Sequence, residues 1–263
     1  MIFHQPPRPI HAGTGNDVIK SGGFCRRCGR KHWLGPGNTL AHSRQLMDLL
    51  TDQGTIDLFA GHSPALPALA TDWLLGPARG KMFGILECLG PDGTTTILRA
   101  FSGQYNGFWL VDGWVPPLFP VDEFMALSAL VEPRIKALSR DIDGCRAHDE
   151  KWLNLRRERR RQSQQLMREM HGLYRLSNFR GETVGLDEAF YGEKSGMPTG
   201  TGDCCAPKLL NYAARNQLRP VGLTEFYWGR ENPSGTRQHG TFSGSCREKC
   251  QPILGFMLCG LEE

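Results

Sequence analysis

The spacing of hydrophobic and polar residues in the first half of the chain predicts an amphipathic helix followed by a β-hairpin. Residues 39–53 carry leucines at helical spacing, and Gly54 directly after them is a typical helix end. The apolar runs 82–89 and 95–101 are separated by a Gly-Pro-Asp-Gly turn, which is the pattern of two antiparallel strands.

The second half of the chain is predicted to be mainly helical, with one further strand. Residues 121–176 are expected to form a helical insertion. The segments after the insertion are expected to form a helix, a strand and a last helix, over residues 203–215, 221–227 and 245–258. These elements predict an α/β fold with a small sheet flanked by helices.

The composition is that of a globular protein and does not indicate a particular function. The 263 residues include 40% hydrophobic and 22% charged side chains, with a mild net charge of +4, as in ordinary globular proteins. No apolar run reaches the ~18–20 residues of a membrane span, and the start of the chain does not have the pattern of a secretory signal. The nine cysteines are therefore expected as thiols or metal ligands in a reducing, cytoplasmic compartment.

A first group of metal-ligand residues lies near the N-terminus. Cys25 and Cys28 form a Cys-x2-Cys pair, a glycine follows the second cysteine, and His32 lies within reach. Zinc takes about four nitrogen or sulfur ligands, and such a pair on a tight turn supplies two of them. Two candidates remain for the fourth ligand, His42 and the more distant His11. The alternative interpretation is a turn with two free thiols and a surface histidine.

A second group lies in the last 60 residues of the chain: Cys204, Cys205, His239, Cys246 and Cys250. The expected order is a hairpin, a helix that begins with cysteine, a strand, and a helix that begins with Cys-x3-Cys. This order resembles that of zinc-dependent nucleoside and nucleic-acid deaminases. The resemblance implies that Cys205, Cys246 and Cys250 bind zinc, with Cys204 as the alternative first ligand, and that water takes an open position on the metal.

The second group departs from the deaminase pattern in two respects. The deaminases have a Cys-x2-Cys pair, and they place a glutamate two residues after the first ligand, where this chain has Ala206 or Pro207. Asp203 and Glu225 are the nearby carboxylates that could carry the proton instead. If His239 were the fourth ligand, it would close the site and make it a structural staple.

Several motifs resemble a second family. They include Lys81-Met82-Phe83-Gly84, Gly202-Asp203-Cys204-Cys205-Ala206-Pro207-Lys208 and Glu225-Phe226-Tyr227-Trp228-Gly229. Over about residues 78–261 they resemble, in order, the N-terminal extension of certain RluA-type pseudouridine synthases. The Arg-Leu-Asp motif of the synthase domain is absent from this sequence. The resemblance therefore implies a role linked to RNA modification, without synthase activity.

A run of arginines within the predicted helical insertion is the strongest local charge in the chain. It comprises Arg156, Arg157, Arg159, Arg160 and Arg161. Glu158 is the only acid among them, so the arginines cannot all be paired within the run. Such a cluster suits phosphate contacts with RNA. The alternative interpretation is a solvated helix face.

These observations predict a zinc knuckle plus helix over residues 1–75 and a deaminase-like α/β domain over 76–263. We expect a zinc-dependent, deaminase-like hydrolase that acts on RNA or a nucleotide. The alternative is a non-catalytic, zinc-stapled RNA-binding module. A toxin or effector with the same fold is a third possibility.

Overall fold

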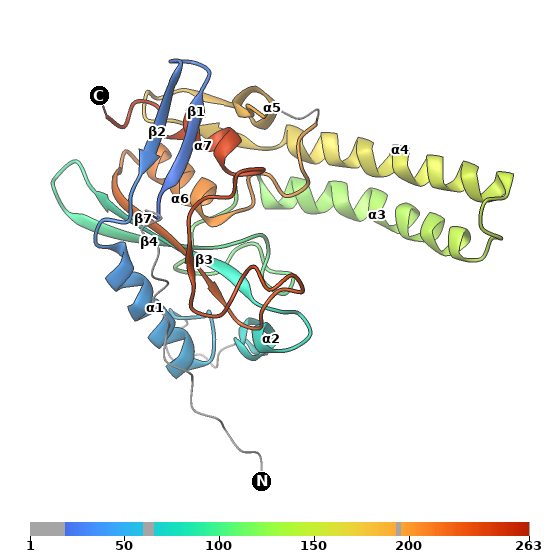
Figure 1. Ribbon diagram of the computed structural model, residues 1–263, viewed down its shortest axis with the longest axis horizontal. Coiled ribbons are helices and arrows are strands. Elements are labelled where there is room, and N and C mark those ends of the chain that lie inside the picture. The colour runs from blue at the N-terminus through green and yellow to red at the C-terminus, as the bar shows by residue number, and fades with distance from the viewer. Residues whose placement is uncertain (1–18, 60–65, 193–195, 263) are drawn as a thin grey trace, which may run out of the picture.

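The centre of the protein is a four-stranded antiparallel sheet. The computed structural model describes residues 19–59, 66–192 and 196–262. In the order β4-β3-β7-β8, the strands are Thr95–Phe101, Lys81–Leu89, Arg219–Trp228 and Phe242–Ser243. The expected hairpin is confirmed as β3 and β4, and the expected later strand is confirmed as β7, which pairs with β3 (Figure 1).

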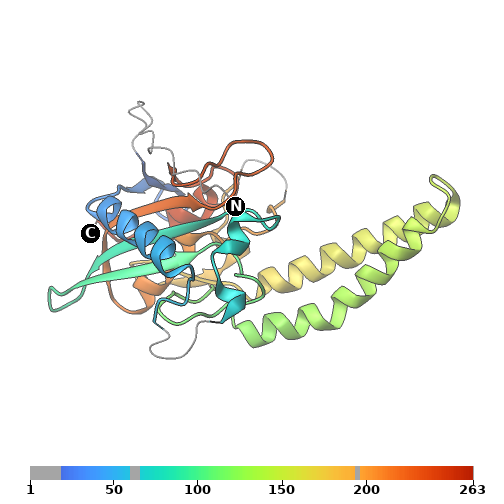
Figure 2. The same cartoon turned by 90° about the horizontal axis from the view of Figure 1, so that it is seen from below.

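Each face of this sheet carries its own hydrophobic core, because successive strand residues point to opposite sides. Phe83 and Ile85 of β3 pack in one core with α1, Thr39–Gln53. Leu86 of the same strand packs in the other core with α6, Cys205–Arg215. Figure 2 shows α1 crossing one face of the sheet. The fold is therefore mixed α/β, with helices on both faces of an antiparallel sheet.

A second, smaller sheet near the N-terminus packs against the last helix of the chain. Strands β1, Ser21–Cys25, and β2, Arg30–Leu34, form an antiparallel hairpin. This hairpin packs directly on α7, Gln251–Met257. The approach is so close that a Cβ atom added at Gly255 would overlap with the backbone of Phe24. The N-terminal hairpin thus depends on the C-terminal helix, while a domain boundary at residue 75 stays a prediction.

We expect Gly255→Ala to destabilise the fold, because the added methyl has no space between α7 and β1. The overlap is with backbone atoms, which cannot rotate away as a side chain can. Overpacking of this kind costs about 1–3 kcal/mol of unfolding free energy. Gly172→Ala is the matched control, because nothing lies within 4 Å of a Cβ there. Chemical denaturation of both variants tests this, and equal stability of the two would contradict the close approach.

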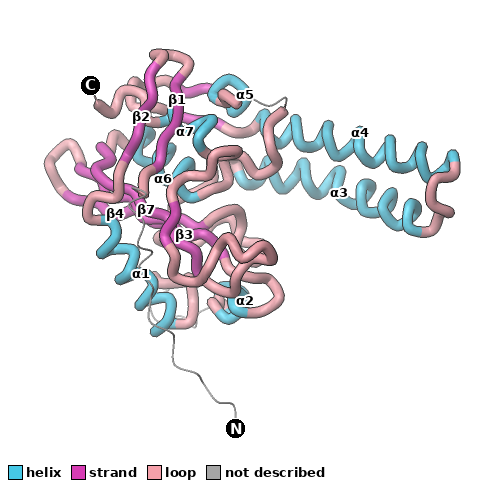
Figure 3. Tube along the Cα trace, in the orientation of Figure 1, coloured by secondary structure: helices cyan, strands magenta, loops and turns pink. Residues whose placement is uncertain are grey.

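Two long helices extend away from the sheet as an antiparallel hairpin (Figure 3). They are α3, Val121–Asp143, and α4, Glu150–Gly172, which confirms helix over most of the expected insertion. Asp149 begins α4 by accepting a 2.6 Å hydrogen bond from the backbone N–H of Trp152, as an N-cap residue does. Leu166 and Met170 are buried on this helix.

The remaining elements are short. They are η1, Pro67–Leu69; α2, Asp72–Leu75; β5, Arg175–Ser177; β6, Thr183–Gly185; and α5, Leu186–Ala189. The last helix begins at Gln251, six residues later than residue 245, where the sequence predicts it. The reason is local: the carbonyl of Cys246 accepts from the N–H groups of both Cys250 and Gln251, which forms a turn there. Among the helices of the described residues, none combines the length and the hydropathy that a bilayer-spanning segment needs.

Candidate metal centres

The first candidate centre has four possible ligands, of which the sequence indicates three. The ligand atoms of Cys25, Cys28, His32 and Cys259 all lie within 4.8 Å of one another. Cys25 ends β1, Cys28 lies in the turn, His32 lies on β2, and Cys259 follows α7. The turn is closed by a 2.9 Å hydrogen bond from the Gly29 N–H to the carbonyl of Cys25. Gly29 itself has a left-handed φ of 71°, a conformation that glycine adopts without steric cost.

These four residues fit a tetrahedral zinc ion. Zn–S bonds of ~2.3 Å place two sulfur ligands ~3.8 Å apart, which is compatible with the observed grouping. The Cys28 Sγ and His32 Nε2 atoms lie 3.0 Å apart. Burial opposes ionisation of Cys28, but hydrogen bonds from His32 and the Arg30 backbone outweigh it and lower its pKa to about 6. Burial raises the pKa of Cys259 to about 12, so an uncompensated thiolate there is unfavourable without a cation.

Cys259 is the fourth candidate ligand, the position for which the sequence indicates a histidine. His42 lies on α1, where its Nδ1 is 3.3 Å from Gln45 Oε1, and it does not belong to this group. The prediction of His42 as a ligand is therefore wrong in this structure, because α1 packs on the central sheet and not on the β1–β2 hairpin. His11 lies outside the described residues. No local spacing indicates Cys259, since more than 220 residues separate it from its partners.

The second candidate centre consists of three cysteines. Cys204, Cys246 and Cys250 have their sulfur atoms within 4.8 Å of one another, and those of Cys246 and Cys250 are 3.4 Å apart. Cys250 is buried, whereas Cys204 and Cys246 are half-buried. Hydrogen bonds with the thiols of Cys204 and Cys250 lower the pKa of Cys246. Three thiols around one point, two of them partly open to solvent, fit a zinc ion that keeps a fourth position free.

The structure selects Cys204 over Cys205 as the first member of this group. Cys204 is the N-cap residue of α6 and has an extended backbone, so its side chain leaves the end of the helix. Cys205 begins the helix itself, and its thiol donates a 3.3 Å hydrogen bond to the carbonyl of Met82 on β3. Burial raises the pKa of Cys205 well above its usual value. The expected ligand Cys205 is thus a core residue, and the alternative, Cys204, takes its role.

His239 is not brought to the three cysteines. Its Nδ1 accepts a 3.0 Å hydrogen bond from the backbone N–H of Gly229, and its ring lies against that of Trp228 with centroids 4.0 Å apart. Among the described residues, the possible metal ligands of this second centre include no histidine. The alternative in which His239 is the fourth ligand and closes the site therefore does not hold for this structure.

Glu225 is the carboxylate that the fold brings to the second centre. It lies on β7, is 4% exposed, and accepts a 3.1 Å hydrogen bond from the backbone N–H of Ala206 in the first turn of α6. Burial, with a contribution from the nearby Cys246, raises its pKa to about 7. A carboxyl group with a pKa near neutrality can both accept and return a proton.

Asp203 directs its carboxylate to another partner. Its Oδ1 accepts a 2.6 Å hydrogen bond from the hydroxyl of Tyr174, a residue that the sequence analysis does not single out. Lys208 lies nearby on α6, almost fully buried, and donates to the carbonyls of Phe101 and Gly103. Burial lowers the pKa of Lys208 to about 8. The backbone N–H of Gly103 donates a 2.8 Å hydrogen bond to the carbonyl of Asp203, which holds the segment before Cys204 against the end of β4.

The arginine run is divided by the structure. Arg161 forms ion pairs with Glu158 at 2.8 Å, and Glu158 also lies 3.9 Å from Arg134 of α3. The other four arginines line a cavity of about 1120 Å³ beside α4: Arg156, Arg157, Arg159 and Arg160. The run is thus not one uniform charged face.

Comparisons of this chain with family models, with curated proteins and with solved structures found no significant match. The two family resemblances of the sequence therefore stay predictions.

Proposed function

We propose that this protein is a zinc-dependent hydrolase that deaminates a nucleobase at the centre formed by Cys204, Cys246 and Cys250. A zinc ion held by three protein ligands keeps a position for water and lowers the pKa of that water. The observation that carries the proposal is the buried carboxylate of Glu225 beside three clustered thiols, of which those of Cys204 and Cys246 belong to half-buried residues.

The order of elements supports the proposal. Leaving out the α3–α4 insertion and the short elements, the central fold runs α1, β3, β4, α6, β7, α7. The candidate ligands lie at the start of α6 and just before α7, which is the order that the resemblance to zinc-dependent deaminases implies. The first centre, with three thiols and one imidazole, offers four ligands and would then serve only to hold the fold.

Glu225 is the residue to which we assign proton transfer. In hydrolytic deamination, the oxygen of water forms a bond to the ring carbon, and the exocyclic amino group leaves as ammonia. Glu225 accepts a proton from the water and returns it to the leaving nitrogen, so that it ends unchanged. Its hydrogen bond to Ala206 supports this role, because Ala206 lies two residues after Cys204, where the deaminases carry their own glutamate.

Asp203 takes a supporting role in this proposal. Its carboxylate is held by Tyr174, so it fixes the backbone next to Cys204 and has less freedom to move protons. We therefore assign positioning to Asp203 and catalysis to Glu225. Loss of activity in Asp203→Asn with unchanged activity in Glu225→Gln would reverse the assignment.

We expect Glu225→Gln to lower the rate of base conversion by about 100- to 10,000-fold, the usual contribution of a general acid–base group. Zinc content should stay unchanged, because Glu225 is not a ligand. The zinc-loaded protein is incubated with RNA, single-stranded DNA and free nucleosides, and mass spectrometry detects C-to-U or A-to-inosine conversion.

Glu87→Gln is the matched control for this experiment. Glu87 is also a buried glutamate, 8% exposed, but it lies on the α1 side of the neighbouring strand β3. Its replacement tests the effect of removing a buried charge without touching the proposed centre. Absence of conversion by the unmutated protein on all three substrate classes would refute the deaminase proposal.

A non-catalytic RNA-binding module is the second candidate function. The arginine-lined cavity beside α4 favours it, because this surface needs no chemistry at the cysteines. In that case both metal centres hold the fold, and Glu225→Gln changes neither RNA binding nor zinc content.

A further inference from the structure

A charged groove runs along the free side of α4. Its cavity of about 1120 Å³ is lined on one side by α4, and on the other by Asp187 of α5 together with Gly196, Met197 and Thr199. Five arginines line it: Arg156, Arg157, Arg159, Arg160 and Arg168. Asp187 is the only acidic residue among the lining residues of the described chain. The groove is therefore strongly positive.

The groove arginines differ from Arg161 in their lack of acidic partners. Within the described residues, none of the five has a carboxylate oxygen within the 4.0 Å of an ion pair, whereas Arg161 is bound to Glu158. Arg156 instead lies over the ring of Trp152, with its guanidinium carbon 4.4 Å from the ring centroid. Arg156 and Arg160 lie four residues apart on α4, so their unpaired like charges repel one another. An anionic ligand would relieve this repulsion.

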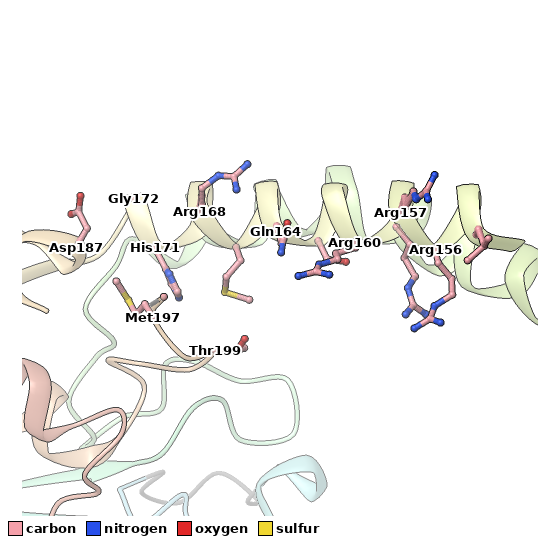
Figure 4. Close-up of a pocket in the computed structure, with 15 residues that line it drawn as sticks. Arg156, Arg157, Arg160, Gln164, Arg168, His171, Gly172, Asp187, Met197 and Thr199 are labelled. Carbon is pink, nitrogen blue, oxygen red and sulfur yellow. The ribbon is translucent and has the colours of Figure 1, made fainter. Parts of the chain in front are cut away.

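The spacing of the polar side chains matches a linear polyanion. Arg156, Arg160 and Gln164 follow one another at intervals of four residues, which corresponds to a rise of ~6 Å each along the helix. Successive phosphates of an extended nucleic-acid strand are separated by a similar distance. Figure 4 shows these side chains, together with His171, along the side of α4 that faces Met197 and Thr199.

The inner end of the groove is less charged and lies near Asp203, the residue before Cys204. Met167, His171 and Met197 line it there and offer apolar and planar surface for a base. Residues 196–199 continue along the chain to Asp203 and Cys204. The ring of His171 also packs edge-on against Tyr174, the partner of Asp203. A strand that follows α4 inward would thus reach the segment that carries the first cysteine of the centre.

We propose that the α4 groove binds the sugar–phosphate backbone of a single-stranded polynucleotide and guides one of its bases toward Cys204. This inference deepens the proposed function, and its link to catalysis rests on it, while binding itself does not. A single strand fits the requirement that a base be unstacked before its ring can be attacked.

Fluorescence anisotropy with a labelled 12-nucleotide RNA, at a series of salt concentrations, tests the groove. For single strands, log K falls with log salt by ~0.7 for each phosphate contact. We expect Arg156→Gln/Arg160→Gln to weaken binding at least about tenfold at low salt and to flatten the slope by ~1.4, since two contacts are lost. Glutamine keeps the helix propensity of these exposed positions, and circular dichroism checks that the helix persists.

The matched control removes the same charge from the same helical hairpin. Arg134→Gln/Arg161→Gln lies outside the groove, because both arginines face Glu158. It should leave the slope unchanged. An equal loss in both double variants, or no RNA binding at low salt, overturns the proposal. Tighter binding of duplex RNA or of poly-glutamate than of the single strand also overturns it, the latter in favour of an acidic protein partner.

Two further arms separate this proposal from the proposed function. A single-stranded DNA of the same sequence shows whether the 2′-hydroxyl contributes, and equal affinity assigns recognition to the phosphates alone. A result in which Glu225→Gln and the unmutated protein bind RNA equally well, while neither converts a base, would refute the deaminase proposal and support the groove. If Arg156→Gln/Arg160→Gln leaves the conversion of RNA unchanged at subsaturating RNA, the guiding role of the groove is refuted and the deaminase proposal stands.

Discussion

Replacement of Cys259 by serine should release one of two zinc ions per chain and strongly destabilise the protein. Cys259 is the only member of the first centre outside the β1–β2 hairpin, so its bond to zinc would tie the two ends of the fold together. Structural zinc contributes about 10–16 kcal/mol of apparent binding free energy in small zinc peptides, and that energy stabilises the fold. Even a net loss of about 5 kcal/mol lowers Tm by about 10–20 °C in a chain of this size.

Metal analysis and differential scanning calorimetry measure this effect. Cys25→Ser/Cys28→Ser should lose the same ion and retain the other. Cys145→Ser is the control, because this half-buried cysteine belongs to neither group within the described residues. Zinc content that stays at two in Cys259→Ser, or falls in His42→Ala, would show that Cys259 is not the fourth ligand. One zinc ion or none in the unmutated protein would refute the two-site interpretation itself.

The second large effect is expected from Cys204→Ser. The neutral hydroxyl of serine is a poor zinc ligand compared with a thiolate, so the second ion should be lost while the first remains. Base conversion should fall to the uncatalysed level, because no acidified water remains for Glu225 to deprotonate. Folding should weaken less than in Cys259→Ser, since all three cysteines of this centre lie in the C-terminal part of the chain.

The neighbouring residue provides a sharp control. Cys205→Ser keeps a hydroxyl that can donate to the carbonyl of Met82, so it should retain both zinc ions and activity at a modest cost in stability. The two variants differ by one position in the sequence. Loss of zinc in Cys205→Ser with retention in Cys204→Ser would restore Cys205 as the ligand and show that α6 begins differently.

The elements that depend on local chemistry could be predicted from the order of residues alone. The helix Thr39–Gln53 ends where Gly54 can adopt its left-handed φ of 62°, and the strands of the central hairpin flank a turn with glycine and proline. Cys25 and Cys28 could be predicted as ligands because their spacing places both sulfurs on one turn. Each of these features involves residues that are close in the chain, so propensity and spacing are sufficient to indicate them.

Contacts between residues that are distant in the chain depend on how the elements pack, so no local pattern predicts them. Cys259 joins the first centre because α7 packs on β1, and Glu225 reaches the second because β7 lies beside α6. Cys204 and Cys205 are equivalent by spacing, yet the N-cap residue and the first helical residue point in different directions. The separation of Arg161 from the groove arginines is local, because its partner Glu158 lies three residues earlier on the same helix, and only the contact of Glu158 with Arg134 depends on the packing of α4 against α3. The element types follow from local preferences, while the ligand set and the charged groove follow from packing across the whole chain.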